Sequence, residues 1–279
     1  MFDTGSLDEL LGQGRRVAVK LGAGWCSMCD DLDREVLATE AGRAVFEGVA
    51  TCGVDFDAAP ELVRRLAILE LPTVVVLGPD GLEVGRVVGF SDPGSWIAEA
   101  REAVVADDPV PAMREGAAAG EPRAMLALGE ALLSRAPDEG VAWLERVSWG
   151  DDDLAMHALW VLGRYYHRVC ADPRTARLVW QQLALRWPDQ HSLQAVWWYG
   201  KAQAELGRVD LGSRAFEAWA ELCPGDARPI TDWAIYAGRH GYDAARPAIR
   251  AAASAAAERA RGDDRDQLEE LVMNLSKPF

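Results

Sequence analysis

The sequence predicts an α/β domain followed by an all-α domain built from helical repeats. Up to about residue 105, short runs of β-branched residues alternate with amphipathic stretches. From residue 112 onward the apolar spacing is helical, and this part holds 9 of the 11 tryptophans. A length of 279 residues also fits two domains. We therefore predict an α/β domain over 1–107, a linker over 108–111 and a helical domain over 112–279.

The first domain is predicted to have the element order α-β-α-β-α-β-β-α. Ser6 with Glu9 forms a capping-box pattern, Pro60 suits the first turn of a helix, and Pro79-Asp80-Gly81 is a turn. The predicted elements are, in order, helix 6–11, strand 17–21, helix 29–46, strand 49–56, helix 59–69, strand 73–77, strand 83–88 and helix 95–105. This order indicates a mixed sheet covered by helices.

The linker is predicted at Asp107-Asp108-Pro109-Val110-Pro111, because two prolines and two acidic residues interrupt the pattern. Beyond it, glycines that follow an apolar residue recur at intervals of 34, 37 and 38 residues; they are Gly129, Gly163, Gly200 and Gly238. A small residue, an aromatic residue and a proline follow the central two. This pattern resembles the tetratricopeptide repeat (TPR), in which glycine or alanine lies where paired helices approach. The resemblance implies four helical hairpins over about 112–275.

Charge and cysteine content exclude several classes of protein. The net charge is −15, and residues 1–108 contribute −11 of it, so nucleic acid and anionic membrane surfaces are not expected partners. Five sparse cysteines do not form a disulfide framework. No apolar run approaches 20 residues, and the first eleven residues lack the features of a signal peptide. The expected location is the cytoplasm.

The segment Gly24-Trp25-Cys26-Ser27-Met28-Cys29 joins a predicted strand to a predicted helix. A cysteine at a helix N-terminus is favoured as a thiolate, the form that attacks disulfides. The alternative is a structural zinc site, which requires four ligands. Cys52 is alone and none of the four histidines lies in this domain, so we expect neither a metal nor another cofactor. Cys52 itself is predicted to be buried in a strand.

These residues and their spacing resemble the thioredoxin family over about residues 1–107. Trp25-Cys26-x-x-Cys29 matches the redox motif of the family, and the stretch 57–73 matches its central region without a gap. Pro72 occupies the place of the family's cis-proline, 43 residues after Cys29, and Gly89 matches the glycine after the last strand. The predicted domain lacks the first strand of the family, and in this respect it resembles the compact C-terminal domains of DsbD proteins.

The resemblance implies roles for particular residues. Cys26 is implied as the exposed nucleophile and Cys29 as the more buried resolving cysteine. The remaining supporting residues are Trp25, Leu71, Pro72 with a cis peptide bond, Thr73 and Gly89.

Three departures from the family pattern bear on the chemistry. Lys20 stands where the family has a buried carboxylate, and we expect its charge to lower the pKa of Cys26. The dipeptide Ser27-Met28 leaves the redox direction open. Asp30, Asp31 and Asp33 follow Cys29 and oppose thiolate formation.

The layout of the whole chain is similar to bacterial thioredoxin–TPR fusions known as chaperedoxins. It implies a thiol–disulfide oxidoreductase that acts on protein cysteines, with the helical repeats binding protein substrates. The alternative is a co-chaperone or scaffold that holds clients with little redox turnover. A related alternative is a thioredoxin fold that is used for binding and has idle cysteines. The implied partners are protein thiols or disulfides, or unfolded clients, together with a thiol reductant or reductase. The tryptophans of the helical part are expected mainly in helix packing.

Overall fold

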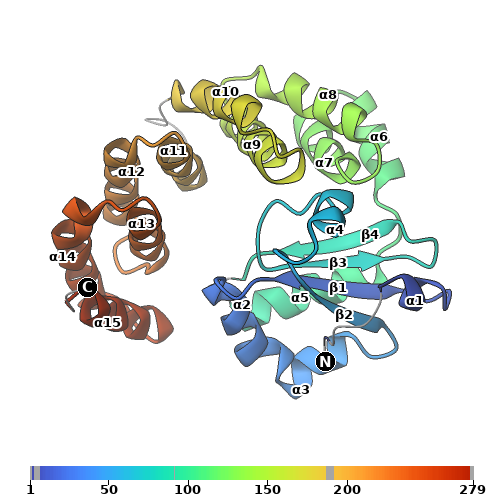
Figure 1. Cartoon of the computed structure of the whole chain (residues 1–279), viewed down its shortest axis with the longest axis horizontal. Coiled ribbons are helices and arrows are strands. Elements are labelled where there is room, and N and C mark those ends of the chain that lie inside the picture. Colours follow the sequence, from blue (N-terminus) through green and yellow to red (C-terminus); the bar gives the residue numbers. More distant parts are fainter. Residues whose placement is uncertain (1, 3–6, 91, 187–191, 277–279) are drawn as a thin grey trace. The chain divides into compact units, whose positions relative to one another are not determined.

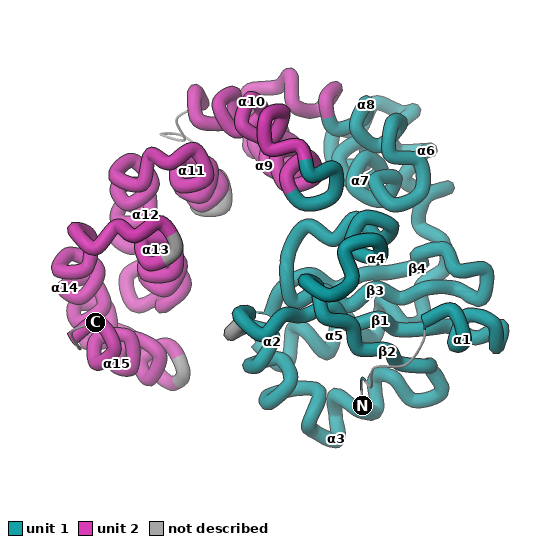
Figure 2. The backbone as a smooth tube through the Cα atoms, in the orientation of Figure 1, with its two compact units in different colours: residues 1–144, 168–171 teal, residues 145–167, 172–279 magenta. Residues whose placement is uncertain are grey.

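The computed structural model describes residues 2, 7–90, 92–186 and 192–276. The chain divides into two compact units, which Figure 2 distinguishes by colour. Unit 1 contains Met1–Leu144 and Arg168–Ala171, and unit 2 contains Glu145–His167 and Asp172–Phe279. Unit 1 thus combines the α/β part with the first helices that follow it.

Four strands in the described part of the chain form one mixed sheet with the order β2-β1-β3-β4 (Figure 1). They are β1 (Val17–Gly22), β2 (Ala50–Asp55), β3 (Thr73–Leu77) and β4 (Glu83–Val88). Strand β1 pairs in parallel with β2 and antiparallel with β3, and β3 pairs antiparallel with β4. The four strands predicted from the sequence are confirmed, because β-branched runs bounded by turns fix them locally.

The helices of the α/β part are mostly short. They are α1 (Leu7–Leu11), α2 (Ser27–Leu32), the π-helix η1 (Asp33–Leu37), α3 (Glu40–Val45), α4 (Pro60–Arg65) and α5 (Pro93–Val105). The Asp92 side chain caps α5 by accepting a hydrogen bond from the Ser95 amide at 2.9 Å. The predicted cap at Ser6 lies outside the described residues.

The predicted continuous helix over 29–46 is wrong. The chain forms α2, η1 and α3 in succession, and the hydroxyl of Thr39 caps α3 by accepting from the Gly42 amide at 3.1 Å. A Cβ on Gly42 would overlap the Val36 carbonyl, so α3 folds back tightly onto η1. A capping threonine and a small residue therefore outweigh the helical apolar pattern.

The two faces of the sheet bury separate apolar clusters. One contains alternate β1 residues, such as Val19 and Leu21, together with Cys26, Cys29 and residues of α1 and α4. The other contains Ala18 with residues of α2, η1, α3 and α5. Since side chains alternate along a strand, Lys20 lies on the same face of β1 as Ala18.

Unit 1 continues beyond the sheet with α6 (Val110–Ala118), α7 (Pro122–Leu132) and most of α8 (Pro137–Ser148). Helix α6 begins inside the predicted linker, with Pro111 in its first turn. After α7, the Arg135 guanidinium donates to the Glu83 carbonyl on β4 and to Asp108 Oδ1, the latter at 2.7 Å. These contacts attach the first helices to the last strand.

Every later element in the described residues is a helix. They are α9 (Asp153–Arg164), η2 (Tyr165–Val169), α10 (Pro173–Ala184), α11 (Leu193–Glu205), α12 (Val209–Leu222), α13 (Arg228–Arg239), η3 (Asp243–Ala245), α14 (Arg246–Ala257) and α15 (Asp263–Leu275). None of the helices in these described ranges combines the length and the apolar character needed to cross a membrane.

The recurring glycines differ in their surroundings. A Cβ on Gly163 in α9 would overlap the Trp180 ring of α10, and a Cβ on Gly200 in α11 would approach Phe216 of α12 to 3.3 Å. A Cβ on Gly238 would meet nothing within 4 Å. Two of the repeated glycines therefore lie against the aromatic residue of the next helix, whereas Gly238 has open space beside it.

Candidate redox site

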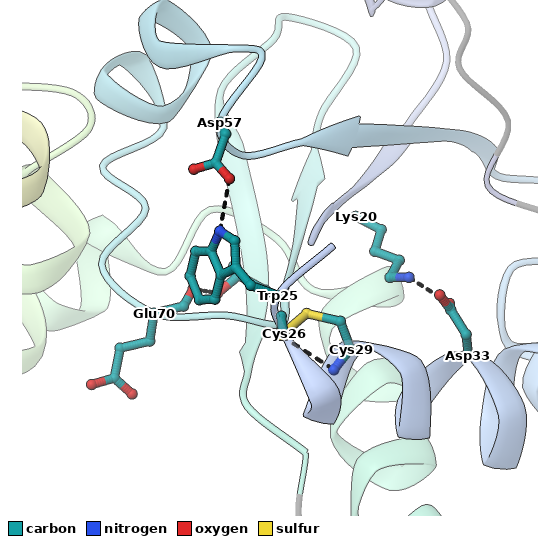
Figure 3. The surroundings of a disulfide bond; sticks show 8 residues. Lys20, Trp25, Cys26, Cys29, Asp33, Asp57 and Glu70 are labelled. Atoms are coloured by element: carbon teal, nitrogen blue, oxygen red, sulfur yellow. Dashed lines mark hydrogen bonds and ion pairs between the residues drawn. A yellow bond between two sulfur atoms is a disulfide. The ribbon is translucent and has the colours of Figure 1, made fainter. Parts of the chain in front are cut away.

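The two cysteines of the Cys-x-x-Cys motif form a disulfide at the junction of β1 and α2 (Figure 3). The sulfurs are 2.10 Å apart and the Cα atoms 5.2 Å apart. Cys26 is the N-cap of α2, and its Sγ accepts a hydrogen bond from the Cys29 amide at 3.2 Å. Both residues are buried in this oxidised state, with exposed fractions of 7% and 3%, so the expectation of an exposed Cys26 is wrong for the disulfide form. A thiol that attacks this disulfide must therefore reach one of the sulfurs from the protein surface beside it.

That surface carries two exposed apolar side chains of the motif, Trp25 at 52% and Met28 at 45%. The Trp25 indole Nε1 donates a hydrogen bond of 2.7 Å to Asp57 Oδ2. The ring also contacts Phe56 edge-on, with centroids 6.3 Å apart. The two contacts hold the exposed indole in a fixed position on the surface beside the disulfide.

Asp57 is a site residue that the sequence did not single out. It follows β2, and the Asp55 carboxylate accepts hydrogen bonds from the amides of Asp57 and Ala58, both at 2.9 Å. This turn places the Asp57 side chain opposite the indole. The matched central region of the family includes Asp57, but no local pattern connects it with a residue 32 positions earlier.

The segment before β3 contributes Leu71 to the apolar cluster that contains Cys26 and Cys29. The Leu71–Pro72 peptide bond is cis. The Thr73 hydroxyl donates to the Glu70 carbonyl at 2.8 Å, and the Gly89 amide donates to the Pro72 carbonyl at 2.7 Å. Gly89 has a φ of +79°, a conformation that favours glycine. The four predicted supporting residues 71–73 and 89 thus form one connected stretch at the ends of β3 and β4.

Lys20 and Asp33 form an ion pair on the Cys29 side of the disulfide (Figure 3). The Lys20 side chain is 11% exposed, whereas that of Asp33 is 51% exposed. A Cβ on Gly22 would lie 3.5 Å from Cys29 Sγ and 3.9 Å from Lys20 Cε. Both atoms therefore lie near the same point on β1, which places the Lys20 side chain on the Cys29 side of the disulfide.

The other cysteines lie elsewhere. Cys52 is 1% exposed in β2, which confirms the prediction of a buried strand residue, and Cys170 is exposed. Cys223 is partly buried. Burial, the largest cause, and the charge of Asp226 both raise the pKa of its thiol. Among the described residues, no three side chains of the metal-binding types are grouped so as to hold an ion.

Comparisons with known proteins match part of the chain. No family model matches the chain. Thioredoxin from Mycolicibacterium smegmatis is 31% identical over 98 residues, which cover 34% of this chain and 85% of that protein. The thiol:disulfide interchange protein DsbD from Cronobacter sakazakii is 31% identical over 94 residues, which are 31% of this chain. The chain spans only 16% of the length of that DsbD.

Two solved structures are also similar to part of the chain. A DsbH oxidoreductase is 14% identical with a TM-score of 0.34, and the match covers 37% of this chain and 84% of that one. A thioredoxin from Thermus thermophilus is 25% identical with a TM-score of 0.34, over 44% of this chain and 95% of that one.

Proposed function

This chain belongs to the thioredoxin family, and from that premise we propose that it is a thiol–disulfide oxidoreductase that acts on protein cysteines. The observation that carries the proposal is the Cys26–Cys29 disulfide at the junction of β1 and α2, with an exposed Trp25 before it and a cis Leu71–Pro72 bond whose Leu71 belongs to the same apolar cluster. We propose Cys26 as the nucleophile because it caps α2, where the Cys29 amide points at its sulfur.

In the reducing direction, the Cys26 thiolate attacks one sulfur of a substrate disulfide. A bond forms between Cys26 Sγ and that sulfur, and the other substrate sulfur leaves as a thiolate that takes a proton from water. Cys29 then loses its proton and attacks Cys26 Sγ, which releases the second substrate thiolate. Two electrons pass to the substrate, the Cys26–Cys29 disulfide forms, and a dithiol reductant or reductase restores the thiols. The same steps in reverse oxidise a substrate dithiol.

A protein substrate fits the surface around the disulfide better than a small thiol does. Trp25 and Met28 offer apolar contacts, and Leu71, two residues before β3, belongs to the same apolar cluster as the two cysteines. An extended segment of a substrate can pair with the backbone at such a position as an added strand. We propose that Leu71, Pro72 and Thr73 form this platform.

We also propose that the helical part selects protein substrates, in a TPR-like arrangement similar to that of chaperedoxins. Large apolar side chains are exposed on it, among them Trp149 at 87% and Leu222 at 62%. The same observation favours a second candidate function, a co-chaperone or scaffold that holds unfolded clients with little redox turnover. The two functions differ in whether catalysis depends on both cysteines.

Reduction of insulin disulfides by dithiothreitol separates these functions. We expect the wild type to accelerate the reaction and both Cys26→Ser and Cys29→Ser to abolish the acceleration. Cys170→Ser, which changes an exposed cysteine outside the motif, serves as the control and should match the wild type. If the wild type is no faster than Cys26→Ser, the oxidoreductase proposal fails and the client-holding function gains support.

The proposed substrates can be identified by trapping. Cys29→Ser leaves the first step intact and blocks the second, so it should accumulate mixed disulfides with substrate proteins in cells. Cys26→Ser should trap none. Fractionation of the same cells tests the cytoplasmic location, which we retain as part of the proposal.

A further inference from the structure

We infer that Lys20, held by Asp33, is a positioning residue for the second step of the exchange: it stabilises the thiolate of Cys29, the resolving cysteine. The inference rests on the proposed function and deepens it. It also changes the expectation drawn from the sequence, which connected Lys20 with Cys26. Three features of the structure support it: the location of Lys20, the burial of Cys29 and the balance of charge around the disulfide.

The location of Lys20 points to Cys29. Its Cε and the Cys29 Sγ both lie within 4 Å of the point where a Cβ on Gly22 would stand. Asp33 is one helical turn after Cys29, at the start of η1, and its carboxylate binds the Lys20 ammonium. The ion pair thereby holds the lysine ammonium on the Cys29 side of the disulfide (Figure 3).

Burial makes this stabilisation necessary. Cys29 is 3% exposed, and burial in apolar surroundings raises the pKa of a thiol. The resolving thiol must nevertheless lose its proton to water before it can attack Cys26 Sγ. A fixed positive charge beside Cys29 lowers the cost of that ionisation.

The acidic groups around the disulfide act in the opposite sense. Asp30 and Asp31 lie on α2, Asp57 follows β2, and Glu70 precedes cis-Pro72 (Figure 3 shows the last two). The carboxylates of Asp30 and Asp57 belong to exposed residues, so water screens their fields.

Within the ion pair the two charges are screened unequally. The Asp33 side chain is 51% exposed, whereas that of Lys20 is 11% exposed. The buried charge is screened less by water, so we expect the ammonium to have the larger effect on Cys29.

The direct test measures the pKa of each thiol by alkylation as a function of pH. Cys29 is measured with Cys26→Ser, and Cys26 with Cys29→Ser, both in a background where Cys170 and Cys223 are Ser. Lys20→Met should raise the pKa of Cys29 by about one unit and that of Cys26 by less. Lys20→Arg should restore most of the effect, because the charge is retained.

A kinetic test separates the two steps without a protein substrate. In the same background, the reduced protein is mixed with dithiobis(nitrobenzoate), whose coloured thiolate is released first on attack by Cys26 and again on attack by Cys29. Lys20→Met should slow the second phase about tenfold near neutral pH, since one pKa unit is a tenfold change in thiolate. The first phase should change less than twofold.

Unchanged second phases in Lys20→Met, or a larger shift at Cys26 than at Cys29, would overturn the inference. Equal slowing by Lys20→Met and Lys20→Arg would also overturn it, because that result indicates packing rather than charge. If the protein is inactive toward insulin but shows the two expected phases, the result contradicts only the proposal that the substrate is a protein. Circular dichroism of each variant verifies that it is folded before the kinetics are compared.

Discussion

The Trp25 indole and the Asp57 carboxylate are joined by a 2.7 Å hydrogen bond across the surface beside the disulfide. The bond connects the redox motif to the turn after β2, so it fixes the ring that an incoming polypeptide would meet. Because both residues are exposed, the bond is expected to contribute at most about 1 kcal/mol to stability. Its effect on substrate contact should be larger than its effect on folding.

We therefore predict that Asp57→Ala lowers the rate of insulin reduction several-fold with little change in the free energy of unfolding. Asp57→Asn retains an acceptor oxygen and should lie between the two. Initial rates at limiting insulin and urea unfolding of the same samples measure both quantities. Rates for Asp57→Ala equal to those of the wild type would show that the orientation of Trp25 is unimportant.

Gly89 provides a second prediction through its left-handed backbone. A Cβ there would meet nothing within 4 Å, so Gly89→Ala is penalised by its φ of +79° alone, about 1 kcal/mol. Gly48 has a φ of +78° and equally open surroundings, which makes Gly48→Ala a matched control away from the disulfide. Both variants should lose similar stability in urea, but only Gly89→Ala should slow insulin reduction. Equal rates would argue against a role for the Gly89–Pro72 contact.

The buried carboxyl of Glu130 on α7 predicts a dependence of stability on pH. Its pKa is raised from 4.5 to about 7: desolvation is the largest cause, the Arg86 charge opposes it and the Glu70 charge adds to it. Since the folded-state pKa is the higher one, the stability it provides is full below about pH 4.5 and is lost as the pH rises to about 7. The loss should be about 3 kcal/mol.

Urea unfolding at about pH 5 and about pH 8 tests the sign. Relative to Glu130→Gln, which stays neutral, the wild type should lose stability over this interval. A difference between the two proteins that stays constant with pH would contradict the prediction.

Two helical glycines of unit 2 form a matched pair. A Cβ on Gly163 would overlap the buried Trp180 ring, whereas one on Gly238 has open space. Gly163→Ala should destabilise unit 2 by about 1–3 kcal/mol, because the ring or the helix must move. Gly238→Ala should be neutral or stabilising by up to about 1 kcal/mol, since alanine favours a helix. Thermal unfolding followed by circular dichroism measures the two shifts, and similar shifts would contradict the packing argument.

The sequence was sufficient for those features that depend on local patterns. Strand β3 has four consecutive β-branched residues followed by a leucine, and a proline turn comes after it, so its bounds were predicted without error. The Cys26–Cys29 pair was found from spacing. The break at Thr39 also has a local signal, a capping residue three positions before a glycine, which the apolar pattern concealed.

The remaining features depend on contacts between distant segments. No periodicity connects Lys20 with Asp33, because their pairing requires α2 to lie over one face of β1. The pairing of Trp25 with Asp57 likewise requires the loop after β2 to reach the motif. Gly238 matched the repeat by sequence alone, yet the space beside it is determined by the side chains of other helices.

The contacts of Arg135 with Glu83 and Asp108 affect where the chain can be divided into fragments. A fragment that ends at residue 107 would lose the guanidinium that binds the β4 backbone, and would open the apolar and charged groups beside it to water. We therefore do not expect the α/β part to be an independent unit that ends with α5. Any exchange of helical parts between related chains, in evolution or in the laboratory, would have to leave helices α6 and α7 with the sheet.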